Sequence, residues 1–242
     1  MGAYYFLACL LPPLPGTLGD KLGVPFSETS AILKRNIHPG DEHLLKALLY
    51  SIDTANWENL DQGKSLFIEG GVLSKADFES RRELPDFITA FQEEREKGIR
   101  RFYAFDRLWE IYYEDLLEQA RRSNCRYLLD YVPWEIELRN SLAALRAREV
   151  GRNPEDSTVL GQLRDYDFSS ILTQLKTQKN PLLTERYLDE ERLRRIAHCE
   201  GNSVFALDAI LAYLSRLMIF SRWEKMSAAF DFDNFLYSGG TT

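Results

Sequence analysis

Apolar residues recur every three or four positions along most of the chain, which is the period of an amphipathic α-helix. The pattern is strongest after Asp41, where Leu44, Leu48 and Ile52 fall on one helical face. No stretch alternates apolar and polar residues for long enough to predict a parallel sheet. The chain is therefore expected to be all-α, an irregular multi-helix bundle joined by loops.

Proline, glycine and capping residues indicate where the other helices begin and end. Pro85 is expected in the first turn of a helix that ends at Gly98, and Asn180 with Pro181 begins another. Pro133 predicts either a kink in a continuing helix or the first turn of a new one. Further helices are expected near 27–36, after Ser74, at 99–123, 134–150, 159–177 and 204–226.

The segment "GRNPEDS" at 151–157 is the clearest linker. A chain of 242 residues is long enough for one large domain or two small ones. The pattern leaves open whether residues 1–242 form a single helical domain or two lobes that meet near 151–158. After the last predicted helix, the tail "FDFDNFLYSGGTT" is aromatic at first and then loose.

The chain is acidic, with a formal net charge of −7 and a pI near 5.2. This charge argues against nucleic acid as the main partner, because binding phosphates requires a basic face. Cys9, Cys125 and Cys199 are far apart and odd in number, which is typical of buried thiols in a reducing compartment. The longest apolar run, Tyr4 to Leu11, is too short to span a membrane, which takes roughly 20 residues. The expected location is cytoplasmic, with no transmembrane segment in the chain itself.

Motifs for catalysis, cofactors or metals are not recognisable in the sequence. "GKS" at 63–65 resembles the end of a phosphate-binding loop, but that loop requires a glycine where Glu58 stands, so a simple turn is favoured. The Glu-x-x-His pair of di-iron bundles is missing before all three histidines. His198 and Cys199 are adjacent, and neighbours on a helix point about 100° apart. The prediction is a protein with no catalytic residue, cofactor or metal of its own.

Arginines flank an apolar stripe in the segment "RNSLAALRAREVG" at 139–151. Arg139 and Arg146 are seven residues apart beside the leucines, and Arg148 lies on the other flank. These side chains either pair with acidic residues inside the fold or contact an anionic partner, since arginine binds carboxylates in two-point geometry. Asn140, in mid-helix, is expected to form a structural hydrogen bond between helices.

The longer segment "EIELRNSLAALRAREVG" resembles a motif of the C/d subunit family of V-type and A-type rotary ATPases. In that family an acid is followed three residues later by Asn, and six residues after the Asn by Arg-Ala-Lys/Arg. Glu137, Asn140, Arg146, Ala147 and Arg148 match these offsets. The start "YYFLACLLPPL" is similar to that of a shorter bacterial relative associated with V-type ATPase subunits.

The resemblance implies an all-helical, C/d-like fold with a three-fold repeated body, of which this shorter chain would lack part. It also implies a non-catalytic coupling subunit without cofactor, at the inner face of the membrane, that joins the central stalk to the membrane rotor ring. Met218 and Phe220 stand where a late helix of that family carries acids, so the contact made there is in doubt.

Two other hypotheses remain open at this stage. One is a helical adaptor unrelated to a motor, which binds a partner peptide in a groove beside residues 204–220. The other is an enzyme whose site assembles from scattered residues and contains a deep pocket with converging polar groups.

Overall fold

The computed structural model describes residues 3–81, 84–99, 101, 103–178 and 180–229. Within these residues the protein is all-α, as predicted, with ten α-helices, one short 3₁₀ helix and no strand. The predicted aromatic tail lies outside the described residues.

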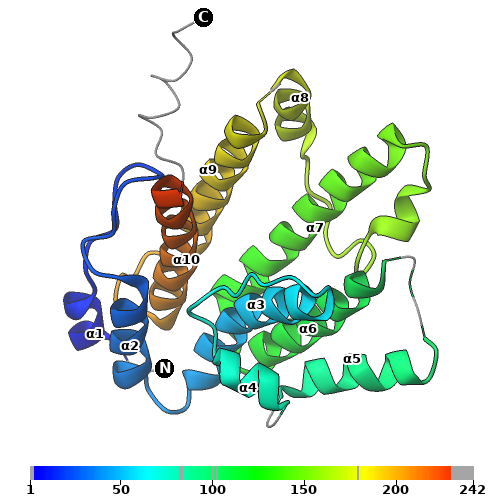
Figure 1. Ribbon diagram of the computed structural model, residues 1–242. Coiled ribbons are helices and arrows are strands. Elements are labelled where there is room, and N and C mark those ends of the chain that lie inside the picture. The colour runs from blue at the N-terminus through cyan, green and yellow to red at the C-terminus, as the bar shows by residue number, and fades with distance from the viewer. Residues whose placement is uncertain (1–2, 82–83, 100, 102, 179, 230–242) are drawn as a thin grey trace, which may run out of the picture. The chain divides into compact units, whose positions relative to one another are not determined.

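The elements, in chain order, follow one another as labelled in Figure 1. They are α1 (Tyr5–Leu10), α2 (Phe26–Asn36), α3 (Glu42–Asp61), α4 (Lys75–Ser80), α5 (Asp86–Glu96), α6 (Ala104–Arg122), α7 (Arg126–Glu149), η1 (Pro154–Ser157), α8 (Ser169–Thr177), α9 (Pro181–Cys199) and α10 (Leu207–Ala229).

The chain forms two compact units, and each is described by itself. The first unit combines residues 1–37 and 185–242, so both ends of the chain belong to it. The second unit contains residues 38–184. The lobe boundary expected near 151–158 does not coincide with this division, because that segment lies within the second unit, where η1 packs on α7.

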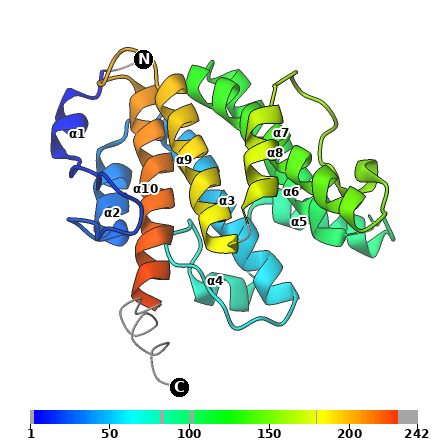
Figure 2. The ribbon, with the colours of Figure 1, turned by 90° about the horizontal axis from the view of Figure 1, so that it is seen from above.

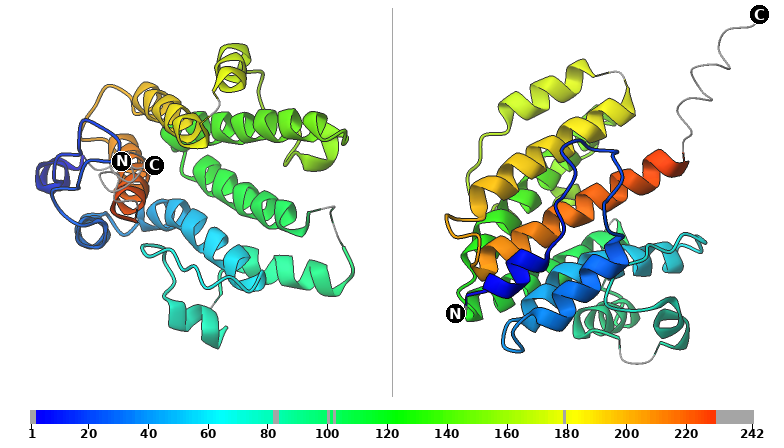
Figure 3. Two further views of the ribbon diagram at one scale, coloured as in Figure 1. Left: turned by 45° about the horizontal axis from the view of Figure 1, so that its top comes forward. Right: turned by 90° about the vertical axis from the view of Figure 1, so that its left-hand side faces the viewer.

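Helix α6 is the central element of the second unit. It packs against α3 and α5 on one side and against α7 on the other (Figure 3). Its apolar stripe explains this position, because Leu108, Tyr112 and Leu116 are each at most 2% exposed. Apolar burial of this kind stabilises a helix packing by about 25 cal/mol per Å².

The structure differs from the sequence pattern, or chooses between its alternatives, at two places in the second unit. Pro133 does not divide its segment, since α7 runs through it from Arg126 to Glu149. The expectation of a helix over residues 159–177 is wrong in its first part, because only Ser169–Thr177 is helical. Leu160 and Gly161 both have positive φ, at 59°, and this left-handed backbone cannot continue an α-helix.

In the first unit, α10 lies between α2 and α9 (Figure 2). The buried carboxylate of Asp189 on α9 ties α9 to α10. It accepts hydrogen bonds from Arg192 on its own helix at 3.0 Å, from the Trp223 indole of α10 at 2.6 Å, and from Arg222. Only 1% of the Asp189 side chain is exposed, and a charge at such depth requires partners of this kind.

Candidate functional site

The candidate residues predicted from the sequence all lie on α7. One of them, Arg139, makes its contacts within the fold. Its Nε donates to Oε1 of buried Glu135, one turn earlier, at 2.7 Å. Its guanidinium also lies over the ring of Trp109 at 4.9 Å and over that of Tyr113 at 5.9 Å, both on α6. Arg139 therefore joins α7 to α6, which is the internal role that the sequence left as one of two alternatives.

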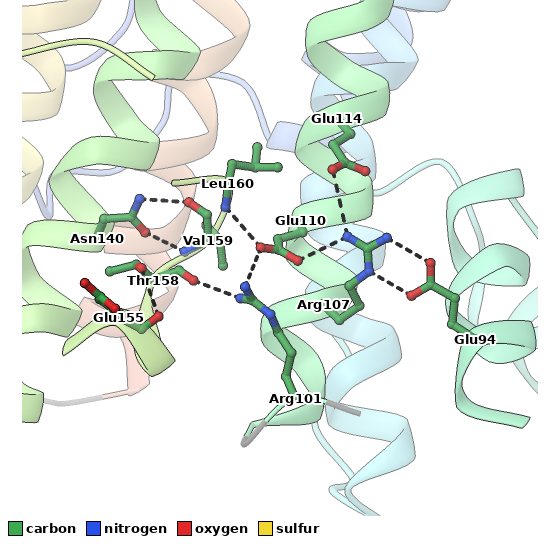
Figure 4. A network of polar contacts seen from close by, with 10 residues as sticks. All are labelled: Glu94, Arg101, Arg107, Glu110, Glu114, Asn140, Glu155, Thr158, Val159 and Leu160. Atoms are coloured by element: carbon green, nitrogen blue, oxygen red, sulfur yellow. Dashed lines mark hydrogen bonds and ion pairs between the residues drawn. The ribbon is translucent and has the colours of Figure 1, made fainter. Parts of the chain in front are cut away.

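Asn140 and Glu137 bind the backbone of the loop that follows η1. The Asn140 side chain exchanges two hydrogen bonds with Val159, accepting its N–H and donating to its carbonyl oxygen, both at 2.9 Å (Figure 4). Glu137 accepts the N–H of Leu163, four residues further along. Asn140 therefore has a structural contact, but its partner is a loop residue and not the second helix that the sequence led us to expect, and Glu137 binds the same loop.

A third side chain, the carboxylate of Glu110 on α6, reaches the same loop from the opposite side. It is buried and accepts the N–H of Leu160 at 3.1 Å, and it pairs with Arg101 at 2.9 Å and with Arg107 at 3.1 Å (Figure 4). Arg107 in turn donates two hydrogen bonds to Glu94 of α5, which lowers the pKa of that carboxyl group. No signal in the sequence indicated this network, because Glu110 looks like any acid on a solvated helix face.

Asp106, one turn before Glu110, has a strongly shifted pKa. Partial burial raises the pKa of Asp106 to about 6, against an opposing effect of Arg101, and the charges of Glu110 and Glu58 raise it further. This carboxyl group therefore titrates close to neutral pH.

Arg146 and Arg148, in the last turn of α7, are exposed. Neither forms an ion pair with any residue that the structure describes. Cations suit the carbonyl end of a helix, which explains part of their placement. Arg139 is also exposed, with 44% of its side chain accessible, so Arg146 and Arg148 differ from it in having no ion pair with a described residue rather than in exposure.

The same loop-binding arrangement occurs on α3. Asn56 exchanges two hydrogen bonds with Ile68, at 2.7 and 2.8 Å, just as Asn140 does with Val159. Asp53, three residues before Asn56, accepts the N–H of Val72, four residues after Ile68, at 2.8 Å. We call this unit a loop clamp: an acid and, three residues later, an amide on a long helix, which bind loop residues four apart.

A related contact occurs on α10 in the first unit. Glu224 accepts the N–H of Leu22 at 3.0 Å, and Ser227 stands where the other helices carry Asn. A Cβ placed on Gly19 would lie 3.0 Å from the Ser227 hydroxyl, so loop and helix are in contact here too. This third loop clamp is incomplete, and it binds a loop near the beginning of the chain to its last described helix.

The three clamped loops share further features. Each contains a glycine with positive φ at or between its clamped positions, namely Gly19, Gly70 and Gly161. Each then leads to a buried phenylalanine in the next helix or at its N-cap, namely Phe26, Phe78 and Phe168. The acid, the glycine and the phenylalanine are common to all three, and the amide to the clamps on α3 and α7, which indicates a repeated supersecondary unit.

Other parts of the described chain carry little chemistry. Gly63 of "GKS" has a φ of 70° and Lys64 is exposed, as expected of a turn. Among the described residues no group of three or more His, Cys, Asp or Glu side chains could hold a metal ion. No helix in the described part of the chain is long and apolar enough to cross a membrane.

Fold and site together define an all-helical protein in which long helices bind the loops that follow or precede them. The chain belongs to the family described as "Protein of unknown function (DUF2764)", whose model matches residues 1–232. No curated protein and no solved structure matches the chain.

Proposed function

We propose that this protein is a non-catalytic coupling subunit of a bacterial V-type (A-type-like) rotary ATPase, which links the central stalk to the membrane rotor ring. The observation that carries the proposal is the motif Glu137, Asn140, Arg146, Ala147 and Arg148, which resembles that of the C/d family. In the fold this motif divides into two parts: Glu137 and Asn140 bind an internal loop, whereas Arg146 and Arg148 are exposed.

The loop clamps support the proposal independently of the arginines. The resemblance implies a helical body built from three repeats. Two complete clamps and one partial clamp occur in the described chain, on α3, α7 and α10. Glu137 and Asn140 of the resembling motif are themselves the acid and the amide of the clamp on α7.

The loop clamps also suit a subunit that transmits torque. A loop that is free to move would yield under load, since exposed loops open at little cost in free energy. Here side chains from rigid helices bind loop N–H and carbonyl groups directly, as Asn140 binds both groups of Val159. Such a body transmits force without any reactive group, and exposed Arg146 and Arg148 offer two-point binding to carboxylates of a neighbour.

Co-purification from the native membrane tests the proposal. The tagged full-length chain, expressed from its own locus, is extracted in mild detergent and its partners are quantified by mass spectrometry. The proposal predicts the catalytic head, stalk and ring subunits in fixed ratio to the chain. Recovery of the chain at full yield without any ATPase subunit would overturn it.

The alternative function is that of a helical adaptor unrelated to a motor. One observation favours it: the first unit has a groove beside residues 204–220, lined by Val204, Ile210 and Phe220 among others. The same purification separates the two functions, because an adaptor brings down its own partner in the absence of stalk and ring.

A further inference from the structure

The groove of the first unit is formed by three parts of the chain. Its walls are the end of α1 with the proline-rich segment after it, the end of α9, and the beginning of α10, and its volume is about 610 Å³. The lining is mainly aliphatic and aromatic, with Leu11, Leu14, Phe205, Ile210 and Phe220 as its larger side chains. A concave apolar site of this size falls in the range of ligand-binding pockets.

The larger polar side chains in the groove already have partners within the first unit. The Tyr213 hydroxyl donates to the Pro12 carbonyl oxygen at 2.7 Å, and burial raises the pKa of this tyrosine to about 12. Arg216 and Glu200 form an ion pair, so their charges cancel. Among the described residues no other charged side chain lines the groove. A complementary ligand is therefore uncharged over the part that lies in the groove.

Exposed apolar side chains lie on α1, which forms part of the groove, and at Val204 within it. Tyr5, Phe6, Leu10 and Val204 are 63%, 69%, 43% and 66% exposed. Val204 lines the groove, and Tyr5 packs on the groove residue Phe205, with ring centroids 4.6 Å apart. A small molecule inside the groove would leave most of these side chains in water. An occupant that covers both surfaces is a protein segment, and contiguous exposed apolar side chains are typical of such contacts.

Two walls of the groove offer few backbone N–H groups to an extended strand. Pro12, Pro13 and Pro15 have no N–H to donate, and α10 satisfies its own backbone hydrogen bonds. These walls favour recognition by side-chain packing, for which an amphipathic helix offers apolar residues at positions i, i+3, i+4 and i+7.

We propose that this groove, together with the exposed side chains of Tyr5, Phe6, Leu10 and Val204, binds the uncharged apolar face of an amphipathic helix from a partner protein. The proposal depends on the first unit alone and does not require the rotary function. The helices that contribute residues to the groove, α1, α9 and α10, are labelled in Figure 1.

Cys9 allows a direct test because it is exposed and lines the groove, whereas Cys125 is buried. The full chain with Cys199→Ser is labelled at Cys9 with an environment-sensitive dye. A phage-displayed library of random 16-residue peptides is selected on the unlabelled chain, and the enriched peptides are then titrated against the labelled chain. The proposal predicts enriched sequences with apolar residues at helical spacing, which change the dye emission and become helical on binding.

Two exposed valines provide a matched pair of variants. Val204→Glu places a charge at the groove, whereas Val150→Glu does so at a residue of the second unit with the same exposure, 67% against 66%. We expect the first to weaken peptide binding at least tenfold and the second to leave it unchanged. The proposal is overturned if no peptide is enriched, or if the enriched peptides bind in an extended conformation or lack apolar residues at helical spacing. It is equally overturned if Val204→Glu does not change peptide binding. It is also overturned if a fatty acid alone saturates the dye response, or if light scattering shows that the site is covered by a second copy of the chain.

Discussion

Arg139 and Arg146 lie seven residues apart on α7, yet they have different surroundings. Arg139 pairs with buried Glu135 and lies over two aromatic rings of α6, whereas Arg146 has no ion pair with a described residue. The difference arises because α6 packs against the first of these turns, and the last turn extends past it. Identical side chains on one helix therefore serve stability at one position and remain available for binding at the other.

This difference predicts unequal costs of truncation. Arg139→Ala removes the ion pair of buried Glu135 and the contact with Trp109, and should lower the free energy of unfolding by about 1–3 kcal/mol. Arg146→Ala, at an exposed position, should change it by less than about 0.5 kcal/mol. Urea denaturation followed by circular dichroism measures both. Equal losses for the two variants would contradict the assignment.

Asp106 predicts a pH-dependent stability. Its pKa is about 6 in the folded chain, against an ordinary value of 3.8, so between these values the folded state binds the proton more tightly than the unfolded state. The contribution of Asp106 to stability is therefore largest below about pH 4 and is lost as the pH rises through 6. An asparagine at position 106 cannot ionise, so a variant that carries it does not lose this stability as the pH rises.

The measurable consequence is a difference in unfolding free energy between the Asp106→Asn variant and the wild type, and this difference grows with pH. Relative to the wild type, Asp106→Asn should gain about 1 kcal/mol in unfolding free energy between pH 4 and pH 7, a value reduced for solvent screening at this partly exposed site. Urea denaturation at several pH values checks it. Asp86→Asn, at an exposed first-turn aspartate of α5, is the control for loss of a carboxylate at a helix start. A difference independent of pH would contradict the prediction.

At the scale of elements, the loop clamps explain how long loops become ordered. The loops after α3 and η1 contain little helix, and their backbone groups need partners when buried. Asn56 and Asn140 provide one donor and one acceptor each, which is the combination that a single peptide residue requires. An amide side chain is suited to this task because a carboxylate accepts hydrogen bonds but cannot donate them.

The loop clamps predict matched effects of two substitutions. Asn140→Ala and Asn56→Ala should each lower the unfolding free energy by about 1–3 kcal/mol, because each leaves a backbone N–H and carbonyl group without partners, buried at Val159 and partly buried at Ile68. Asn202→Ala, at an exposed residue, should change it by less than about 0.5 kcal/mol. Hydrogen exchange should show lost protection of the Val159 N–H in the first variant and of the Ile68 N–H in the second. Unchanged protection at these amides would show that the clamps do not order the loops.

At the scale of the whole molecule, the chain closes on itself within the first unit. The contact of Glu224 with Leu22 joins residues 202 apart in sequence, and the first unit contains both ends of the chain. The repeated clamp pattern thus begins near one end of the sequence and is completed near the other. This contact stabilises both segments, because α2 and α10 pack against each other and bury apolar side chains that either helix alone would expose.

The proposed coupling role predicts the effect of charge reversal on the assembled complex. Arg146→Glu with Arg148→Glu should leave the purified protein folded, because both side chains are exposed and without internal ion pairs to described residues. In the ATPase complex, ATP hydrolysis should continue while ion transport per ATP falls several-fold. Parallel assays of hydrolysis and of ion uptake into vesicles measure this ratio. An unfolded variant would indicate an internal role for these arginines instead.

The sequence alone determined most of the helices and several of their ends. Ser74, for example, begins α4 with a capping box to Asp77, and the leucine spacing after Asp41 made α3 unmistakable. It also indicated Asn140 as a structural residue, because a half-buried amide in mid-helix needs a partner. These features depend on residues within one or two turns of each other, so a local pattern is sufficient to predict them.

Only the tertiary structure decided which partner each polar side chain has. Asn140 binds a residue 19 positions away, Glu137 one 26 away, and Glu224 one 202 away. It also decided that Arg139 packs on α6 while Arg146 and Arg148 face solvent, and that residues 158–168 form a loop where periodicity had suggested a helix. Helical periodicity records which face of a segment is apolar, but the partner of a hydrogen bond depends on where the chain returns, and that is decided by the packing of all the helices in the unit.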